Sequence, residues 1–128
     1  MNTQAEIKYL RISPKKMKPL TGLVIGLSPQ KAMDRLSFMP GKASQLLSQA
    51  IASAKSNAVN NHKMNSNNLK ISEVTVSKGP HFKRWRAVAR GMAHKIKKPT
   101  SHLKVKIEEV SQEKNVKTGK NKDIKENK

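Results

Sequence analysis

Hydrophobic residues recur at helical spacing in three segments of the first half of the chain. The first two segments begin with Ser-Pro, at Ser13 and Ser28, where serine can cap the free N–H groups of a helix and proline fits its first position. The third segment, residues 42–61, has the longest helical repeat in the sequence. We therefore predict three helices, and we expect Pro19 to bend the first or loosen its first turn because proline lacks an N–H donor. The residues expected to face the core are Met17, Leu20, Val24, Met33, Leu36, Ala43, Leu46, Leu47, Ala50, Ile51, Ala54 and Ala58.

Alternation of hydrophobic and polar residues predicts strands on either side of the helical segments. Residues 3–10 fit a short strand, and residues 102–110 alternate cleanly. Residues 69–76 also alternate, with a phase slip near Glu73 that predicts a β-bulge. The strand residues expected to lie on one side are Ile7 with Tyr9, and Leu103 with Val105 and Ile107.

Residues 79–102 fit two patterns. One is a long β-hairpin with arms of roughly ten residues, about 30 Å long, which is marginally stable in water without a surface to cover it. The other is an amphipathic basic helix, typical of membrane-surface or calmodulin-type targets, although a central glycine disfavours it by about 1 kcal/mol. Four of the seven residues from 87 to 93 are Ala or Gly, which suits a slender tip or an ordinary flexible turn. The apolar stripe of the helix pattern consists of Trp85, Val88, Met92 and Ile96.

The charge of the chain indicates what kind of partner it binds. The 128 residues include 27 Lys or Arg and only 8 Asp or Glu, giving a formal net charge of +19. No acidic residue lies between Glu73 and Glu108, whereas ten Lys or Arg do. Solvated surfaces normally mix the two signs, so this interval indicates contact with a polyanion, nucleic acid first and an anionic membrane second. Phe82 and Trp85 lie among these cations and either stack on unpaired bases or anchor the segment against the core.

Residues suited to catalysis or metal binding are scarce. The sequence has no Cys, and His81, His94 and His102 have no acidic neighbours at the spacing of metal ligands. No serine lies in a nucleophile-elbow motif. We therefore predict no metal site, no cofactor and no enzymatic activity. Because no run approaches about 20 apolar residues, we expect a soluble, intracellular protein.

The segment 79–102 also resembles the signature of a known family. That pattern runs Gly-Pro, two variable residues, Lys-Arg, later Ala-Arg-Gly, an Ile, a basic pair, then Thr-Ser-His before an alternating strand. The segments RISPKKMKPLTGLVIG, QKAMDRLSFMPGKAS and SAKSNAVNN resemble the helices of the same family, so the likeness spans roughly residues 5 to 109. The chain resembles the universal L-twenty-two family of large-subunit ribosomal proteins, of bacterial type. The matching signature residues are Gly79, Pro80, Lys83, Arg84, Ala89, Arg90, Gly91, Ile96, Lys97, Thr100, Ser101 and His102.

This resemblance implies an α+β fold with three helices packed on a small three-stranded antiparallel sheet and a long protruding β-hairpin. Residues 1–110 are expected to form one domain, with the hairpin at about 77–99. Residues 111–128 are polar with scattered charges, and we expect them to form a disordered basic tail. At the tip this chain departs from the family pattern, with Ala87 where proline is usual and Val88 and Met92 where arginine is usual.

The resemblance further implies a structural constituent of the ribosome that binds large-subunit ribosomal RNA and bridges its domains during assembly. The hairpin tip would line the polypeptide exit tunnel beside ribosomal protein number four, along the path of the nascent polypeptide. The ribosome would be that of the cytoplasm or of an organelle, and no membrane partner is expected. The alternative is a basic amphipathic module for anionic membranes or another nucleic acid. The expected RNA contacts are Arg11, Lys15, Lys16, Lys18, Lys83, Arg84, Arg86, Arg90, Lys95, Lys97, Lys98 and His102. The expected tip residues are Ala87, Val88, Ala89, Arg90, Gly91 and Met92.

Overall fold

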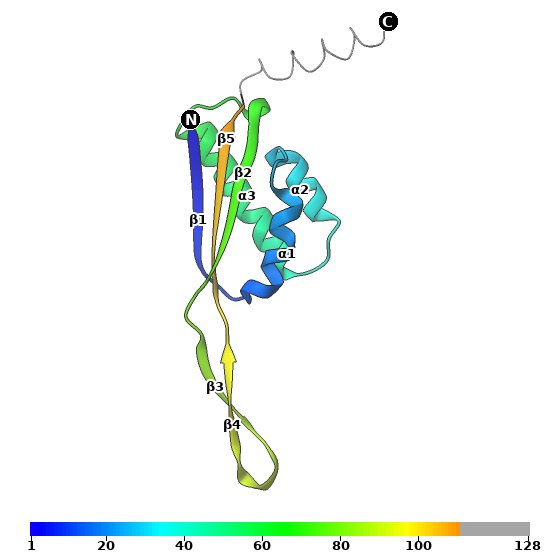
Figure 1. The fold of residues 1–128 in the computed structure, drawn as a ribbon, viewed down its shortest axis with the longest axis vertical. Helices are drawn as coiled ribbons and strands as arrows, with labels where there is room; N and C mark the ends of the chain where they lie inside the picture. The colour runs from blue at the N-terminus through cyan, green and yellow to red at the C-terminus, as the bar shows by residue number, and fades with distance from the viewer. Residues whose placement is uncertain (111–128) are drawn as a thin grey trace, which may run out of the picture.

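Three strands form an antiparallel sheet in the order β1-β5-β2, comprising β1 (Asn2–Leu10), β2 (Leu69–Lys78) and β5 (Ser101–Glu109) (Figure 1). The structure is a computed structural model and describes residues 1–110, so the tail predicted at 111–128 lies outside the described residues. The clean alternation of β5 suits its central place, because every second side chain turns to the same face of a strand. The register between β2 and β5 shifts between Ile71 and Glu73, which confirms the predicted bulge.

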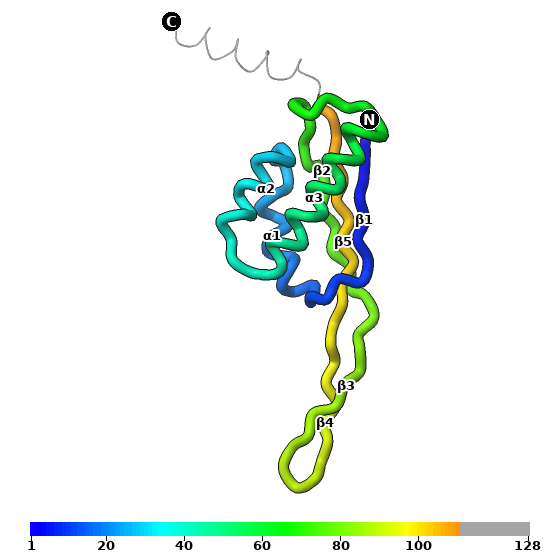
Figure 2. The backbone as a smooth tube through the Cα atoms, turned by 180° about the vertical axis from the view of Figure 1, so that it is seen from behind, coloured from blue at the N-terminus to red at the C-terminus, as the bar shows by residue number. Residues whose placement is uncertain are grey.

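Three helices cover one face of this sheet and leave the other face open, as the two opposite views show (Figures 1 and 2). They are α1 (Pro14–Val24), α2 (Pro29–Ser37) and α3 (Lys42–Asn60), and a short 3-10 turn η1 (Ser66–Asn68) follows α3. The Ser28 hydroxyl caps α2 by accepting a hydrogen bond from the Lys31 N–H at 3.4 Å. At the start of α1 the Lys16 N–H instead donates to the Ser13 carbonyl at 3.2 Å, which tightens the first turn. The helix then continues through Pro19.

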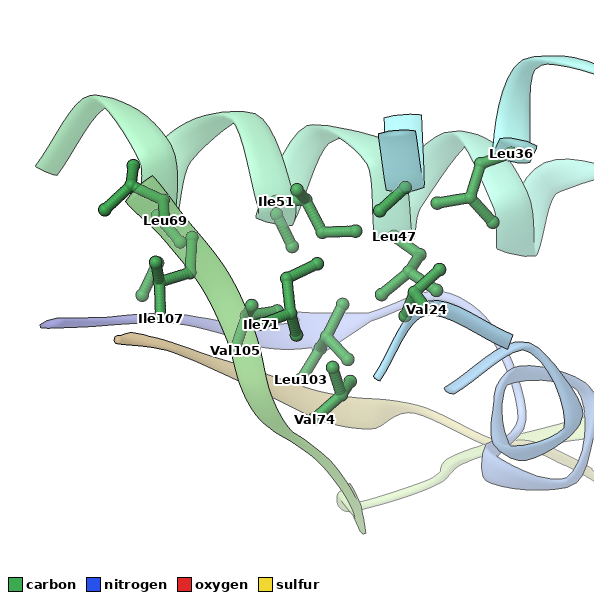
Figure 3. Close-up of a cluster of buried hydrophobic side chains, with 14 of the residues drawn as sticks. Val24, Leu36, Leu47, Ile51, Leu69, Ile71, Val74, Leu103, Val105 and Ile107 are labelled. Carbon is green, nitrogen blue, oxygen red and sulfur yellow. The ribbon is translucent and has the colours of Figure 1, made fainter. Parts of the chain in front are cut away.

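The core lies between α3 and the sheet, with α1 and α2 closing its edge (Figure 3). Leu47 and Ile51 of α3 are fully buried and face the sheet residues. Small residues let α3 approach closely, since Ala50, Ala54 and Ala58 are also fully buried. The helical spacing therefore predicted the inward face of α3 correctly. The fully buried strand residues opposite it are Ile71, Leu103, Val105 and Ile107.

Tyr9 corrects the prediction for the first strand. The pairing of β1 with β5 becomes irregular between Ile7 and Leu10, and Tyr9 has a φ of 60°. This left-handed backbone turns its side chain away from the side on which Ile7 packs, and 62% of Tyr9 is exposed. The alternation of residues 3–10 did not indicate this irregularity.

Within residues 79–102, residues 82–98 form the hairpin and Ser101 begins β5 of the main sheet. The helix interpretation was therefore wrong, and the membrane alternative loses the amphipathic helix on which it depended. Strand β3 (Phe82–Ala87) pairs with β4 (Ala93–Lys98) in a separate two-stranded ribbon that projects from the end of the main sheet (Figure 1). The ribbon prolongs the antiparallel course of β2 and β5, which a helix would interrupt. At the tip, the Val88 N–H donates to the Met92 carbonyl at 2.9 Å around the 3-10 turn η2 (Ala89–Gly91).

Candidate nucleic-acid interface

The register of the β3–β4 ribbon sorts its side chains onto two faces. Directly opposed residues share a face, and successive residues alternate between faces. One face, here called the lysine face, comprises Lys83, Trp85, Ala87, Ala93, Lys95 and Lys97. The other, here called the arginine face, comprises Phe82, Arg84, Arg86, His94, Ile96 and Lys98. Both faces carry cations, so a polyanion can approach the ribbon from two sides.

The ribbon is uncovered by its own domain. Every residue of β3 is exposed, and in β4 only Ile96 is partly covered. Lys83 lies directly opposite Lys97, an arrangement of like charges that destabilises a strand pair. No acidic residue within 74–107 can offset that repulsion locally. The predicted cations of the hairpin are therefore exposed together, and none forms an ion pair within residues 1–110.

The two aromatic residues occupy different places in the ribbon. Trp85 is 64% exposed, and the Lys95 ammonium lies 5.5 Å from the centroid of its ring. Phe82 lies near the base, where the guanidinium of Arg84 from the ribbon and that of Arg11 from the domain lie 5.6 and 5.1 Å from its ring. Such cation–π contacts hold aromatic rings and cations together without a core. Neither ring is buried, which excludes anchoring inside the hydrophobic core.

The signature residues Gly79, Thr100 and His102 meet at the neck where the hairpin leaves the domain. The Gly79 N–H donates to the Thr100 carbonyl at 3.0 Å, and the Thr100 hydroxyl donates to the Pro80 carbonyl. A Cβ on residue 79 would lie 2.5 Å from the Thr100 hydroxyl oxygen, so only glycine fits there. The Tyr9 N–H donates to His102 Nδ1 at 3.1 Å, and the two rings meet edge to face with centroids 5.0 Å apart. His102, predicted as an RNA contact, thus has a structural role at the neck.

Arg11 and Lys42 tie the hairpin base to the domain. The Arg11 guanidinium donates to the carbonyls of Lys98 and Pro99, both at 3.4 Å. The Lys42 ammonium donates to the Arg11 carbonyl at 3.0 Å. Sequence reasoning missed Lys42. Its position could have singled it out, because Lys42 is the first residue of α3 and the helix dipole disfavours a cation there. A lysine at such a position suggests a specific contact.

A concave pocket of about 540 Å³ lies at this junction. It brings Arg11 and Lys16, predicted at the first helix, together with Lys97 and Lys98, predicted on the hairpin. The other two predicted cations of the first helix, Lys15 and Lys18, line a separate pocket of about 420 Å³. Pro99 contributes to the lining of both pockets. The remaining predicted cations, Lys83, Arg84, Arg86, Arg90 and Lys95, lie further along the ribbon and line neither pocket. The junction pocket is therefore where both predicted contact zones meet.

The open face of the main sheet has a different charge pattern. Lys106 and Glu73 form an ion pair of 2.7 Å there, the only one within residues 1–110. The hydrogen bond from Lys106, followed by that from Thr75, holds the pKa of Glu73 below its ordinary value of 4.5.

Among the described residues, no group of three or more His, Asp or Glu could hold a metal ion. None of the described helices is long and apolar enough to cross a membrane.

The fold and the charge pattern together define a class of protein: a small basic α+β domain that presents a long, acid-free β-ribbon. Comparison with known proteins gives the family. Residues 5–108 match the family model described as ribosomal protein L22p/L17e. The chain belongs to this family of ribosomal proteins and is a constituent of the large ribosomal subunit, which confirms the resemblance noted in the sequence.

Curated relatives match over almost their whole length. The large ribosomal subunit protein uL22 of Nautilia profundicola is 36% identical over 109 residues, covering 85% of this chain and 99% of the relative. The uL22 of Clostridioides difficile is 38% identical over 109 residues, covering 85% and 98%. The uL22c of Thalassiosira pseudonana is 38% identical over 110 residues, covering 86% and 96%.

Proposed function

We propose that this chain binds large-subunit ribosomal RNA through the β3–β4 ribbon and the basic surface at its base, in a structural rather than catalytic role. The observation that carries the proposal is the exposed ribbon, which sets Lys83 opposite Lys97 within a segment, residues 74–107, that contains no acidic residue. Phosphate groups supply the missing negative charge, and release of their counterions favours binding. The proposed contacts are Arg11, Lys15, Lys16, Lys18, Lys83, Arg84, Arg86, Arg90, Lys95, Lys97, Lys98 and His102.

The two charged faces favour binding between RNA segments rather than along one. A ribbon with cations on both the lysine face and the arginine face can neutralise phosphates on two sides at once. Trp85 is exposed beside Lys95, so its ring is available to stack on an unpaired base. We therefore propose that the ribbon bridges separate domains of the RNA during assembly of the subunit.

We assign the tip, residues 87–92, to the polypeptide exit tunnel, beside ribosomal protein number four and next to the nascent polypeptide. Three features support this assignment. The tip lies at the far end of the ribbon from the domain (Figures 1 and 2). Its small residues, Ala87, Ala89 and Gly91, keep it slender enough for a confined space. Arg90 has a φ of 62°, which fixes a tight turn at this end.

The salt dependence of RNA binding tests the proposal. Replacing Lys83, Arg84 and Arg86 together by alanine should lower the slope of log K against log salt by about 0.7–0.9 for each phosphate that the variant no longer neutralises. The melting temperature should stay nearly unchanged, since all three side chains are exposed. The control replaces Lys31, Lys55 and Lys70 by alanine, which removes the same charge from the domain surface. Equal slopes for both variants would contradict a ribbon-centred interface.

A further inference from the structure

The junction pocket combines cations with an apolar wall. Three segments of the chain line it: residues 11–13 with Lys16, residues 41–43, and residues 96–99 of the hairpin. Five cationic residues and no acidic one belong to this lining. Such a pocket attracts an anion and has no group that repels it. The five cations are Arg11, Lys16, Lys42, Lys97 and Lys98, and the apolar wall consists of Ile12, Ala43, Ile96 and Pro99.

Two of the cations are held in place before any ligand arrives. Lys42 donates to the Arg11 carbonyl at 3.0 Å, and Arg11 donates to the Lys98 and Pro99 carbonyls at 3.4 Å. An arginine has five N–H donors and a lysine ammonium has three, so both keep donors for an external acceptor. Because these side chains are already ordered, binding costs less conformational entropy than at free surface lysines.

The apolar wall narrows the ligand class. An inorganic anion would use only the cations and leave the wall against water. A volume of about 540 Å³ lies in the range of small-molecule sites and admits a single flat ring system with its attached sugar and phosphate. Bases of a duplex stay stacked on their neighbours, whereas bases in unpaired RNA can be turned out of the stack and laid against an apolar wall.

We propose that the junction pocket receives one unpaired nucleotide of the bound RNA. The base packs against Ile12, Ala43, Ile96 and Pro99, and the phosphodiester lies among the cations. This inference rests on the proposed RNA-binding function and deepens it by adding Lys42 to the interface. An occupied pocket joins β4 to the starts of α1 and α3, so the nucleotide also holds the hairpin at a fixed angle to the domain.

Amide chemical shifts of the isotope-labelled full chain test the pocket directly. The probes are the four nucleoside 5′-monophosphates, each added alone, and inorganic phosphate. At least one nucleotide should shift the amides of Ser13, Gly41 and Ile96 in a saturable manner, at lower concentrations than inorganic phosphate does. If phosphate shifts the same amides at equal concentration, the apolar wall is not used and the proposal is wrong.

Two variants separate the pocket from general electrostatic attraction. Lys42→Ala should weaken nucleotide binding about tenfold, as expected for removal of a charge-assisted hydrogen bond. Lys31→Ala, which also removes a lysine from the first turn of a helix but does not line the pocket, should change it less than twofold. Equal effects of Lys31→Ala and Lys42→Ala would contradict the proposal.

A charge-neutral variant tests the apolar wall. Ala43→Leu should fill the pocket and weaken nucleotide binding without weakening inorganic phosphate binding. Since Ala43 also packs against the core, Ile96→Trp in the ribbon serves as the second filling variant if Ala43→Leu fails to fold. Full nucleotide affinity in a folded filled variant would overturn the inference.

Binding of large-subunit RNA distinguishes failure of the pocket from failure of the proposed function. If pocket variants bind this RNA as well as the unaltered chain while the Lys83, Arg84 and Arg86 variant does not, the pocket inference fails and the ribbon interface stands. If neither set of variants lowers RNA affinity, both proposals fail.

Discussion

The open face of the main sheet and the β3–β4 ribbon are both exposed antiparallel surfaces rich in lysine. They differ in whether an acidic residue lies opposite their lysines. On the sheet, Glu6 lies opposite Lys104, and Glu73 pairs with Lys106 at 2.7 Å. On the ribbon, Lys83 lies opposite Lys97, and residues 74–107 contain no acid. The sheet balances its charges by itself and rests on a core, whereas the ribbon has neither. This difference supports our proposal that the ribbon, unlike the sheet, binds a polyanion.

The largest contrast lies in what each region contributes to folding. Ile107→Ala in the fully buried face of β5 should lower the free energy of unfolding by about 2–5 kcal/mol, because it leaves a cavity. Trp85→Ala in the ribbon should change it by less than about 0.5 kcal/mol, because that ring is exposed. Urea denaturation measures both. A large loss of stability in Trp85→Ala would show that the ribbon is part of the cooperative fold.

The neck, where the two regions join, should be the next most sensitive place. Gly79→Ala places a Cβ 2.5 Å from the Thr100 hydroxyl oxygen and 3.2 Å from the His102 ring, so we expect a loss of about 1–3 kcal/mol. Gly22→Ala is the matched control, since Gly22 lies inside α1 and has nothing within 4 Å of an added Cβ. That control should gain about 0.5–1 kcal/mol. Thermal melts compare the two, and a tolerated Gly79→Ala would contradict the close packing of the neck.

Placing an opposite-charge pair in the ribbon, as on the sheet, should stabilise the ribbon and weaken its RNA binding. Lys97→Glu creates an opposite-charge pair with Lys83, which should stabilise the free ribbon by about 0.2–1 kcal/mol. RNA affinity should fall at the same time, because the net charge of the ribbon becomes less positive. Slower amide exchange in β3 and weaker RNA binding measure the two effects. The control Lys106→Glu makes the same change of charge on the open face and should leave RNA affinity nearly unaltered.

The smallest effect concerns the ion pair of the open face. The pKa of Glu73 lies below the ordinary value of 4.5, so Glu73 supports the fold above that pH, and this support is lost as the pH falls through the lowered pKa. Both side chains are exposed, and such pairs contribute little to stability. Lys106→Met should raise the pKa of Glu73 toward its ordinary value, as measured by NMR titration. An unchanged pKa would show that the pair does not form in solution.

Local patterns in the sequence were sufficient for the domain but not for the hairpin. The spacing of Leu47, Ile51 and Ala54 predicted the buried face of α3, because that pattern depends only on helix geometry. Trp85 and Met92 also fell at helical spacing, yet they are 64% and 60% exposed on a ribbon. The pairing of β2 with β5 brings the two ends of this segment together, and β3 then pairs with β4. Periodicity within the segment does not report such pairing.

The candidate interface, too, could be predicted from the sequence only in part. The absence of acid from 74–107 indicated a charged surface, and the ribbon places those cations in the open. The junction pocket could not be predicted, because it arises where residues 11–13 with Lys16, residues 41–43 and residues 96–99 meet in three dimensions. His102 was singled out with Thr100 by the signature, but its contact with Tyr9 depends on the irregular end of β1.

Amide hydrogen exchange of the full chain, free and bound to large-subunit RNA, tests the central claim most directly. A two-stranded ribbon without a covering surface is marginally stable, so β3 and β4 amides should exchange much faster than those of β5 in the free chain. Adding the RNA should protect the ribbon amides and leave β5 unchanged. A ribbon already as protected as β5, and indifferent to the RNA, would contradict the account.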